Sequence, residues 1–288
     1  MEQALQALVS GLLVGSVLAL LSAGFSLVWG ATGTINISHT AFAVAAAYLA
    51  YMLAPRGAAG LVLTLLVGLP LGFAAGVGTY RILVRPAAQR VQDLSLVTLV
   101  VTFGVSMVLE NLLSTRWGPG PRVLRLPVAG EAVSVLGARV PLATLLAAFS
   151  AWLGLAGLWL FLYRSYPGKA VRAVWQDPLG AALCGIDRDR VTDLAFGVAT
   201  ATAVLGGVAM GMVYAFSPAV HIEWLIWAFL IVIVGGVGSL PGATLAGLLI
   251  GLASTAAGLW VAFSWTPLIL FGMLMGVILW RPTGLFRF

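Results

Sequence analysis

Four polar side chains recur at intervals of four residues within one apolar stretch: Thr98, Thr102, Ser106 and Glu110. In a helix this spacing places all four along one face. Polar groups are costly inside a bilayer and often mark the route of a solute, which makes the stripe a candidate wall of a translocation path. Two local roles fit the same residues equally well. The hydroxyls can bond to carbonyls of their own helix or hold helices together, and Glu110 can reach headgroup water from the end of the stretch.

Asn36 and His39 form a second polar group, in a glycine-punctuated segment between two apolar stretches. They could order a break in the helix where a solute passes. Alternatively, Asn36 caps the following helix and His39 bonds to backbone. His221 and Glu223 begin a later apolar stretch. Helix capping and residence at the membrane interface account for them, and contact with a solute-delivering protein is the alternative.

The sequence lacks the residue patterns that are typical of an enzyme's catalytic or metal site. The chain has two histidines and one cysteine, Cys184, and it has neither a Gly-x-Ser-x-Gly elbow nor a cluster with metal-ligand spacing. Lys169 follows Gly168 as in a phosphate-binding loop, but Ala170 replaces the required hydroxyl and Tyr163 stands where the first glycine is needed. We therefore predict no catalytic residues, no metal and no ATP or Mg²⁺ bound by this chain.

The composition indicates a membrane protein. Of 288 residues, 61% are hydrophobic and 8% are charged, whereas soluble domains carry about 25% charged residues. The net charge of +6 comes from basic residues in short loops between apolar stretches, which suits control of topology better than binding of nucleic acid. We expect one membrane domain, residues 1–288.

A spanning helix needs about 20 mostly apolar residues. Such stretches predict an all-α, polytopic protein with about nine transmembrane or re-entrant segments, at 5–29, 38–54, 59–83, 95–115, 140–163, 191–216, 224–238, 243–263 and 265–280. The run at 224–238 is short, and either a tilted span or a re-entrant piece fits it. Glycines spaced by four, as at Gly11 and Gly15, Gly68 to Gly76, Gly247 and Gly251, and Gly272 and Gly276, predict faces where helices approach closely.

The basic residues predict the orientation. Ten lie on one side, which we assign to the cytoplasm: Arg81, Arg85, Arg90, Arg164, Lys169, Arg172, Arg188, Arg190, Arg281 and Arg287. Five lie on the other: Arg56, Arg116, Arg122, Arg125 and Arg139. With nine crossings the N-terminus lies outside and the C-terminus in the cytoplasm. The arginine-containing loop 116–139 opens with prolines and glycines and is predicted to be an ordered external cap.

The cytoplasmic loop 164–190 should hold two short helices outside the bilayer, at about 168–176 and 178–184. Asp177 before Pro178 is a helix-start signal, and Gly185 suits the left-handed residue that closes a helix. Such a helical loop could dock a soluble partner, or it could simply lie on the lipid headgroups.

Five segments, in this order along the chain, resemble the LivH-type permeases of branched-chain amino acid ABC importers. They are Trp29 to His39, Arg85-Pro86 with Thr98 to Asn111, Gly168 to Val191, Gly235 to Ala243, and Arg281-Pro282-Thr283-Gly284-Leu285. The family usually has glycine where this chain has Thr40, which would matter if that position needed a positive φ.

The resemblance implies a permease subunit in the bacterial inner membrane, translocating branched-chain amino acids or related small polar solutes. Its expected partners are a second, LivM-like permease, two ATPase subunits that bind ATP and Mg²⁺, and an extracytoplasmic solute-binding protein. In the coupling loop, Gly168, Lys169, Arg172, Ala173, Asp177 and Gly185 would meet the ATPase. The family's late glycine-rich turn corresponds to Gly235, Gly236, Gly238, Ser239, Pro241 and Gly242. The alternative is a self-sufficient secondary transporter or channel, which usually carries ionisable residues in mid-membrane.

Overall fold

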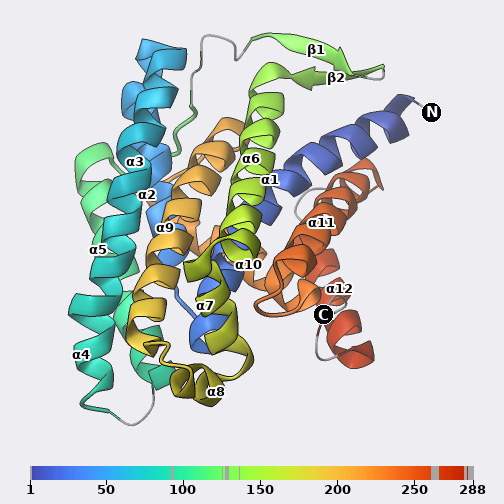
Figure 1. Cartoon of the computed structure of the whole chain (residues 1–288). Helices are drawn as coiled ribbons and strands as arrows, with labels where there is room; N and C mark the ends of the chain where they lie inside the picture. The colour runs from blue at the N-terminus through green and yellow to red at the C-terminus, as the bar shows by residue number, and fades with distance from the viewer. Residues whose placement is uncertain are drawn as a thin grey trace.

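The computed structural model in Figure 1 describes residues 2–91, 94–124, 126, 130–135, 137–260, 266–281 and 284. Arg125 and Arg287, two of the basic residues that predict the orientation, and Pro282, Thr283 and Leu285 of the last family segment lie outside the described residues.

Helices make up most of the described chain, which confirms the all-α class. The helices are α1 (Glu2–Thr32), α2 (Ser38–Leu53), α3 (Ala58–Gly78), α4 (Arg85–Ala88), α5 (Leu94–Trp117), α6 (Leu142–Arg164), α7 (Tyr166–Gln176), α8 (Pro178–Leu183), α9 (Arg188–Val213), α10 (His221–Gly235), α11 (Leu240–Trp260) and α12 (Thr266–Trp280). A π-helical turn, Thr79–Val84, joins α3 to α4, and short 3-10 turns lie at Ala54–Arg56 and Pro218–Val220. Strands β1 (Ala132–Val135) and β2 (Ala138–Pro141) form an antiparallel hairpin.

Seven helical stretches of the described chain are long and apolar enough to cross a bilayer: Glu2–Thr32, Ala58–Ala88, Ser95–Trp117, Leu142–Arg164, Arg188–Val213, Pro218–Gly235 and Leu240–Leu259. The protein is therefore a multi-pass membrane protein. The expected count of nine is not confirmed, because α2 and α12 have only 16 and 15 residues. A helix of 16 residues covers about 24 Å, less than the roughly 30 Å of a hydrocarbon core.

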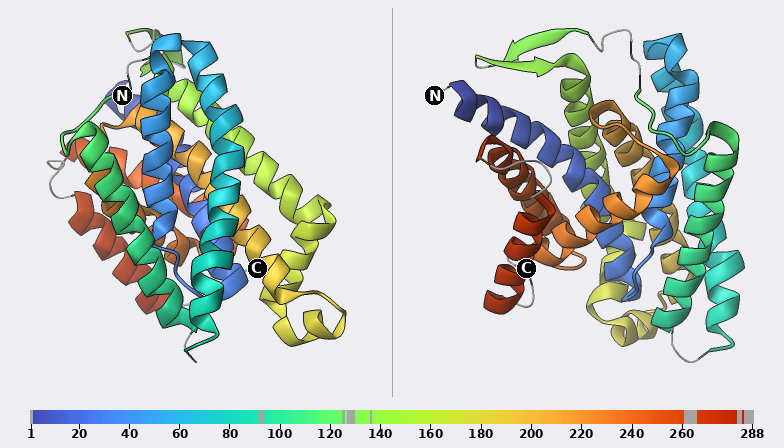
Figure 2. Two further views of the ribbon diagram at one scale, coloured as in Figure 1. Left: turned by 90° about the vertical axis from the view of Figure 1, so that its left-hand side faces the viewer. Right: turned by 180° about the vertical axis from the view of Figure 1, so that it is seen from behind.

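The bundle has two distinct ends (Figure 1). At one, here the hairpin end, lie β1, β2 and the N-terminus; at the other, the α8 end, lie α4, α7 and α8. Both views in Figure 2 place α5 on the outside of the bundle. The basic residues of α4 and of the α7–α8 segment, which the sequence placed on one side of the membrane, thus share one end of the molecule.

Helix α1 forms the centre of the bundle. Every residue from 14 to 28 is buried, a pattern typical of a helix surrounded on all sides. It packs most closely on α11 and α9. A β-carbon on Gly15 would lie 2.9 Å from the carbonyl oxygen of Gly247, and one on Gly247 would lie 2.6 Å from Cα of Ala19.

The predicted small-residue faces at Gly11, Gly15, Gly247 and Gly251 are therefore confirmed as a helix–helix contact within the chain. The second face, Gly68 to Gly76, packs on Phe196, Thr200 and Val204 of α9. By contrast, β-carbons on Gly272 and Gly276 of α12 would meet no described atom within 4 Å.

Candidate functional site

Helices α7 and α8 form a knob at the α8 end, residues 166–183. The side-chain oxygen of Asp177 accepts hydrogen bonds from the backbone N–H groups of Leu179, at 3.1 Å, and Gly180, at 3.0 Å. Gly185 has φ of 77°. Both local predictions are confirmed. Helix α7 begins at Tyr166, two residues earlier than expected, because the Ser165 hydroxyl caps it by accepting from the Gly168 N–H at 3.0 Å.

One side of the knob packs on its own chain. A β-carbon on Gly168 would overlap the backbone of Phe161 in α6, and Val171 and Val174 are buried. The Arg172 guanidinium lies 4.4 Å from the ring centroid of Tyr163, a cation–π arrangement. Gly168 and Arg172, which we expected to meet a partner, thus contact α6 in this structure, and Ala173 is partly buried against the core.

The other side of the knob is exposed and partly apolar. Leu179 and Leu183 of α8 are 71% and 82% exposed, and Tyr166, the first residue of α7, is 83% exposed. Lys169 and Asp177 are exposed as well. Large exposed apolar side chains outside a membrane are typical of an interaction surface. These three apolar residues were not among those predicted from the sequence. The available signal was the spacing of Leu179 and Leu183, one helical turn apart in a segment expected outside the bilayer.

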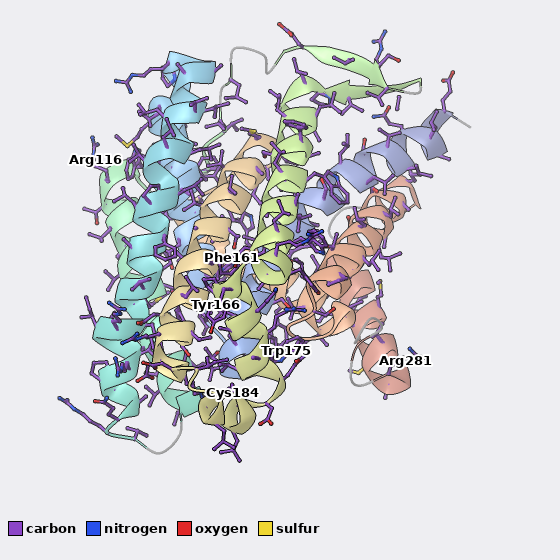
Figure 3. The ribbon with its side chains drawn as sticks, viewed as in Figure 1. Arg116, Phe161, Tyr166, Trp175, Cys184 and Arg281 are labelled. Carbon is purple, nitrogen blue, oxygen red and sulfur yellow. The ribbon has the colours of Figure 1, made fainter. Side chains whose placement is uncertain are left out.

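The glycine-rich turn between α10 and α11 lies directly beside α7. Gly236 and Gly238 have φ of 96° and 77°, and Ser239 caps α11 by accepting from the Gly242 N–H at 3.0 Å. The Gly238 N–H donates to the Ser26 hydroxyl of α1 at 2.9 Å. A β-carbon on Gly238 would overlap the Trp175 ring, and Figure 3 shows Trp175 on the side of α7 that faces this turn. Two segments singled out separately in the sequence are therefore in contact.

The polar residues after α1 serve local structure. The Asn36 side-chain oxygen accepts from the Ser38 N–H at 3.1 Å and from the Ser38 hydroxyl at 2.7 Å. Nε2 of His39, which is fully buried, lies 3.0 Å from the carbonyl oxygen of Leu21. The Asn36 side chain thus bonds to the first residue of α2 without occupying the N-cap position, which is Ile37, and His39 bonds to backbone. Thr40 lies within α2 in helical backbone, where threonine is unstrained.

The first residues of the polar stripe on α5 lie beside the segment that leads into α2. Thr98, Thr102 and Ser106 are buried. The Thr102 hydroxyl donates to the Thr98 carbonyl at 2.7 Å and accepts from the Ile37 N–H at 3.1 Å. The Ser106 hydroxyl donates to the Phe103 carbonyl at 2.7 Å. The hydroxyls of Thr102 and Ser106 thus bond to their own helix, and Thr102 also ties α5 to the segment before α2.

Glu110, the last residue of the stripe, pairs with His221. Glu110 Oε2 lies 3.0 Å from Nε2 of His221, whose side chain is fully buried whereas that of Glu110 is 24% exposed. The pair joins α5 to the first residue of α10. Both residues stood out in the sequence, but nothing there brought them together, because 111 positions separate them.

A charged cluster at the α8 end joins the π-helical turn and α4 to the start of α9. Nε of Arg81 lies 2.6 Å from the Asp193 carboxylate, and Nη2 of Arg85 lies 2.6 Å from that of Asp189. The Tyr80 hydroxyl donates to Asp189 at 3.2 Å. From the sequence, Arg81 served to predict orientation, and Arg85 served for orientation and as part of a segment that resembles the family, but neither was expected to form an ion pair. π-Helical turns such as Thr79–Val84 are frequent at functional sites.

Comparison with known proteins places the whole chain in a family. A family model described as "Branched-chain amino acid transport system / permease component" matches residues 7–279. The high-affinity branched-chain amino acid transport system permease protein BraD of Pseudomonas aeruginosa is 31% identical over 294 residues, covering 98% of this chain and 95% of that protein. The corresponding LivH of Salmonella typhimurium is 27% identical, covering 98% and 94%. A probable LivH of Methanocaldococcus jannaschii is 23% identical, covering 94% and 87%. No solved structure gives a significant match.

Proposed function

Because the chain belongs to the family of branched-chain amino acid transport system permease components, we propose that it translocates branched-chain amino acids or related small polar solutes as one permease subunit of an ABC importer. The observation that carries the proposal is the match over nearly the whole chain to permeases of that name.

Energy for uphill transport comes from two separate ATPase subunits, which bind the ATP and Mg²⁺. The support is the sequence around Gly168 and Lys169, which lacks the hydroxyl and the first glycine of a phosphate-binding loop. The knob is the docking site for the ATPase. Leu179, Leu183 and Tyr166 supply its apolar contacts, and exposed Lys169 and Asp177 fix its orientation. Gly185, with φ of 77°, ends the docking segment.

The α8 end faces the cytoplasm of a bacterial inner membrane, and the hairpin end faces outward. This orientation is supported by the basic residues of the α8 end, among them Arg81, Arg85 and Lys169. It places the N-terminus outside and the C-terminus in the cytoplasm. The solute-binding protein then docks at the hairpin end, which includes much of the loop 116–139.

The solute path runs along α5, between this chain and a second, LivM-like permease. The support is the position of α5 on the outside of the bundle and its polar stripe. Thr98, Thr102, Ser106 and Glu110 order the wall of the path on α5, and Asn36 and His39 hold the adjoining start of α2. In this arrangement the polar residues shape the wall through their bonds within the chain.

The test is reconstitution into vesicles with the ATPases, the second permease and the binding protein, followed by uptake of labelled leucine. We expect uptake that requires both ATP and the binding protein. An assembled complex that hydrolyses ATP without importing leucine would redirect the proposal to other amino acids and short amides. Uptake by this chain without any ATPase would contradict the proposal and favour a secondary transporter or channel.

A further inference from the structure

The turn after α10 contacts two other helices at the level of its backbone. Gly238 follows α10, and a β-carbon on Gly30 of α1 would lie 2.7 Å from its Cα. A β-carbon on Gly238 would in turn meet the ring atoms Cζ2, Cε2 and Cη2 of Trp175 in α7. Glycine has no side chain that could yield, so a displacement of Trp175 relative to α1 must shift the backbone of the turn itself.

The turn is also closely joined to α10. The Gly236 N–H donates to the Val232 carbonyl at 2.9 Å, continuing the helical bonding. A β-carbon on Gly284 would lie 2.6 Å from the Gly236 nitrogen, which leaves little free space around the turn. Helix α10 has 15 residues, about 22 Å of rise. A short helix of this kind moves as a unit because closely packed elements shift between discrete positions rather than deform continuously.

The opposite end of α10 contacts α5. His221, the first residue of α10, pairs with Glu110 at 3.0 Å, and the 3-10 turn Pro218–Val220 immediately before it also packs on α5. Nearer the α8 end, α5 is tied to the segment before α2 through Thr102 and the Ile37 N–H. The hairpin end of α5 is thus attached to the element that begins α10.

We propose that α10 transmits movement of the knob to the hairpin end of α5, with the Trp175–Gly238 contact as its inner joint and the His221–Glu110 pair as its outer joint. Trp175 and Glu110 are then positioning residues for transport, because each acts through α10 and not on the solute. This inference rests on the proposed function, since the knob moves only if an ATPase is docked on it.

The variants are chosen to alter each joint while keeping the general shape of the side chain. Trp175→Phe keeps an aromatic ring but removes the outer ring atoms that meet Gly238, and Glu110→Gln removes the charge of the outer joint. The matched controls are Trp152→Phe, in an exposed part of α6, and Glu223→Gln, which changes an exposed carboxylate in the first turn of α10. Each variant is reconstituted in the full complex.

We expect Trp175→Phe and Glu110→Gln each to lower leucine uptake per ATP hydrolysed by about fivefold or more, the usual lower range for coupling between sites. The ATPase should still co-purify, and the double variant should be no worse than the poorer single variant, because both changes interrupt one connection. Uptake per ATP at the wild-type level in either single variant, or losses that multiply in the double variant, would overturn the inference.

A second readout follows movement directly. Thr115 lies exposed near the hairpin end of α5, and Cys184 is exposed and free. In a Cys184→Ser background, Thr115→Cys is labelled with a membrane-impermeant maleimide, with and without ATP and vanadate. The ATP-dependent change in labelling rate should disappear in both joint variants and persist in both controls. If it persists in the joint variants, the inference fails while the proposed function stands, because the wild-type complex in the same experiment reports uptake independently.

Discussion

Arg81 and Asp193 form an ion pair in which only one partner is buried: the Asp193 side chain is 7% exposed and that of Arg81 is 58% exposed, with 2.6 Å between Nε and the carboxylate. The aspartate lies in the second turn of α9, and the arginine lies in the π-helical turn after α3. The other carboxylate oxygen of Asp193 is buried without a hydrogen-bond partner among the described residues. The carboxylate therefore depends on Arg81 for compensation of its charge.

We predict that Arg81→Ala destabilises the protein by about 1–3 kcal/mol, between the values for exposed and buried ion pairs. The double variant Arg81→Ala with Asp193→Asn should recover most of this loss, because it removes the uncompensated charge. Thermal unfolding in detergent, followed by loss of monodisperse protein, measures the effect. Equal destabilisation by the single and the double variant would contradict this account.

Gly238→Ala should be among the most damaging small substitutions in the chain. The new methyl group would overlap the Trp175 ring, and the residue would be forced into φ of 77°. We expect a loss of more than about 1 kcal/mol, since alanine at positive φ alone costs that much. Thermal unfolding compares it with Gly157→Ala in α6, where a β-carbon would meet no described atom within 4 Å and the change should be neutral to mildly stabilising, because alanine is a better helix former than glycine.

Combining Gly238→Ala with Trp175→Phe separates the two causes. Removal of the outer ring relieves the overlap but leaves the backbone strain, so the double variant should recover only part of the lost stability. Full recovery would assign the whole effect to the ring contact, and no recovery would assign it to the backbone.

Local signals predicted much of the knob. A side-chain oxygen before a proline, as at Asp177, and a glycine after a short helix, as at Gly185, act over a few residues, so the sequence alone is sufficient to recognise them. Small residues spaced by four predicted that α1 would approach another helix closely. The partner, α11, became evident only from the fold, because any of several such faces could have met α1.

Pairings over long separations could not be predicted in this way. Glu110 and His221 were both recognised as polar residues at the ends of apolar stretches, but which pairs with which depends on how α5 and α10 are arranged. The expected count of nine spans is not confirmed for a related reason. Apolar length does not determine how much of a short helix such as α2 or α12 crosses the bilayer, because tilt and packing against neighbours decide this.

The exposed leucines of α8 give a prediction about assembly. Leu179→Ala with Leu183→Ala should weaken ATPase binding by at least about tenfold, because each buried leucine contributes roughly 1.5–3 kcal/mol on docking. Thermal stability of the isolated chain should change little, since both side chains face outward. Co-purification at a series of ATPase concentrations measures the loss. Val133→Ala, in the exposed strand β1 at the other end of the molecule, is the control and should bind normally.

The Thr102 hydroxyl should contribute more to stability than a threonine hydroxyl that bonds only to its own helix. It accepts from the Ile37 N–H, so Thr102→Val leaves a partly buried donor without its partner, at a cost of about 1 kcal/mol, the lower end of the range for buried donors. Thr102→Ser should retain most of the stability. Thr64 is equally buried, but its hydroxyl donates to the Gly60 carbonyl of its own helix, so Thr64→Val should be nearly neutral. Thermal unfolding ranks the stability of the three variants. Hydrogen exchange at the Ile37 amide should accelerate only in Thr102→Val. Equal effects of the two valine substitutions on stability would show that the hydrogen bond between Thr102 and Ile37 contributes nothing specific.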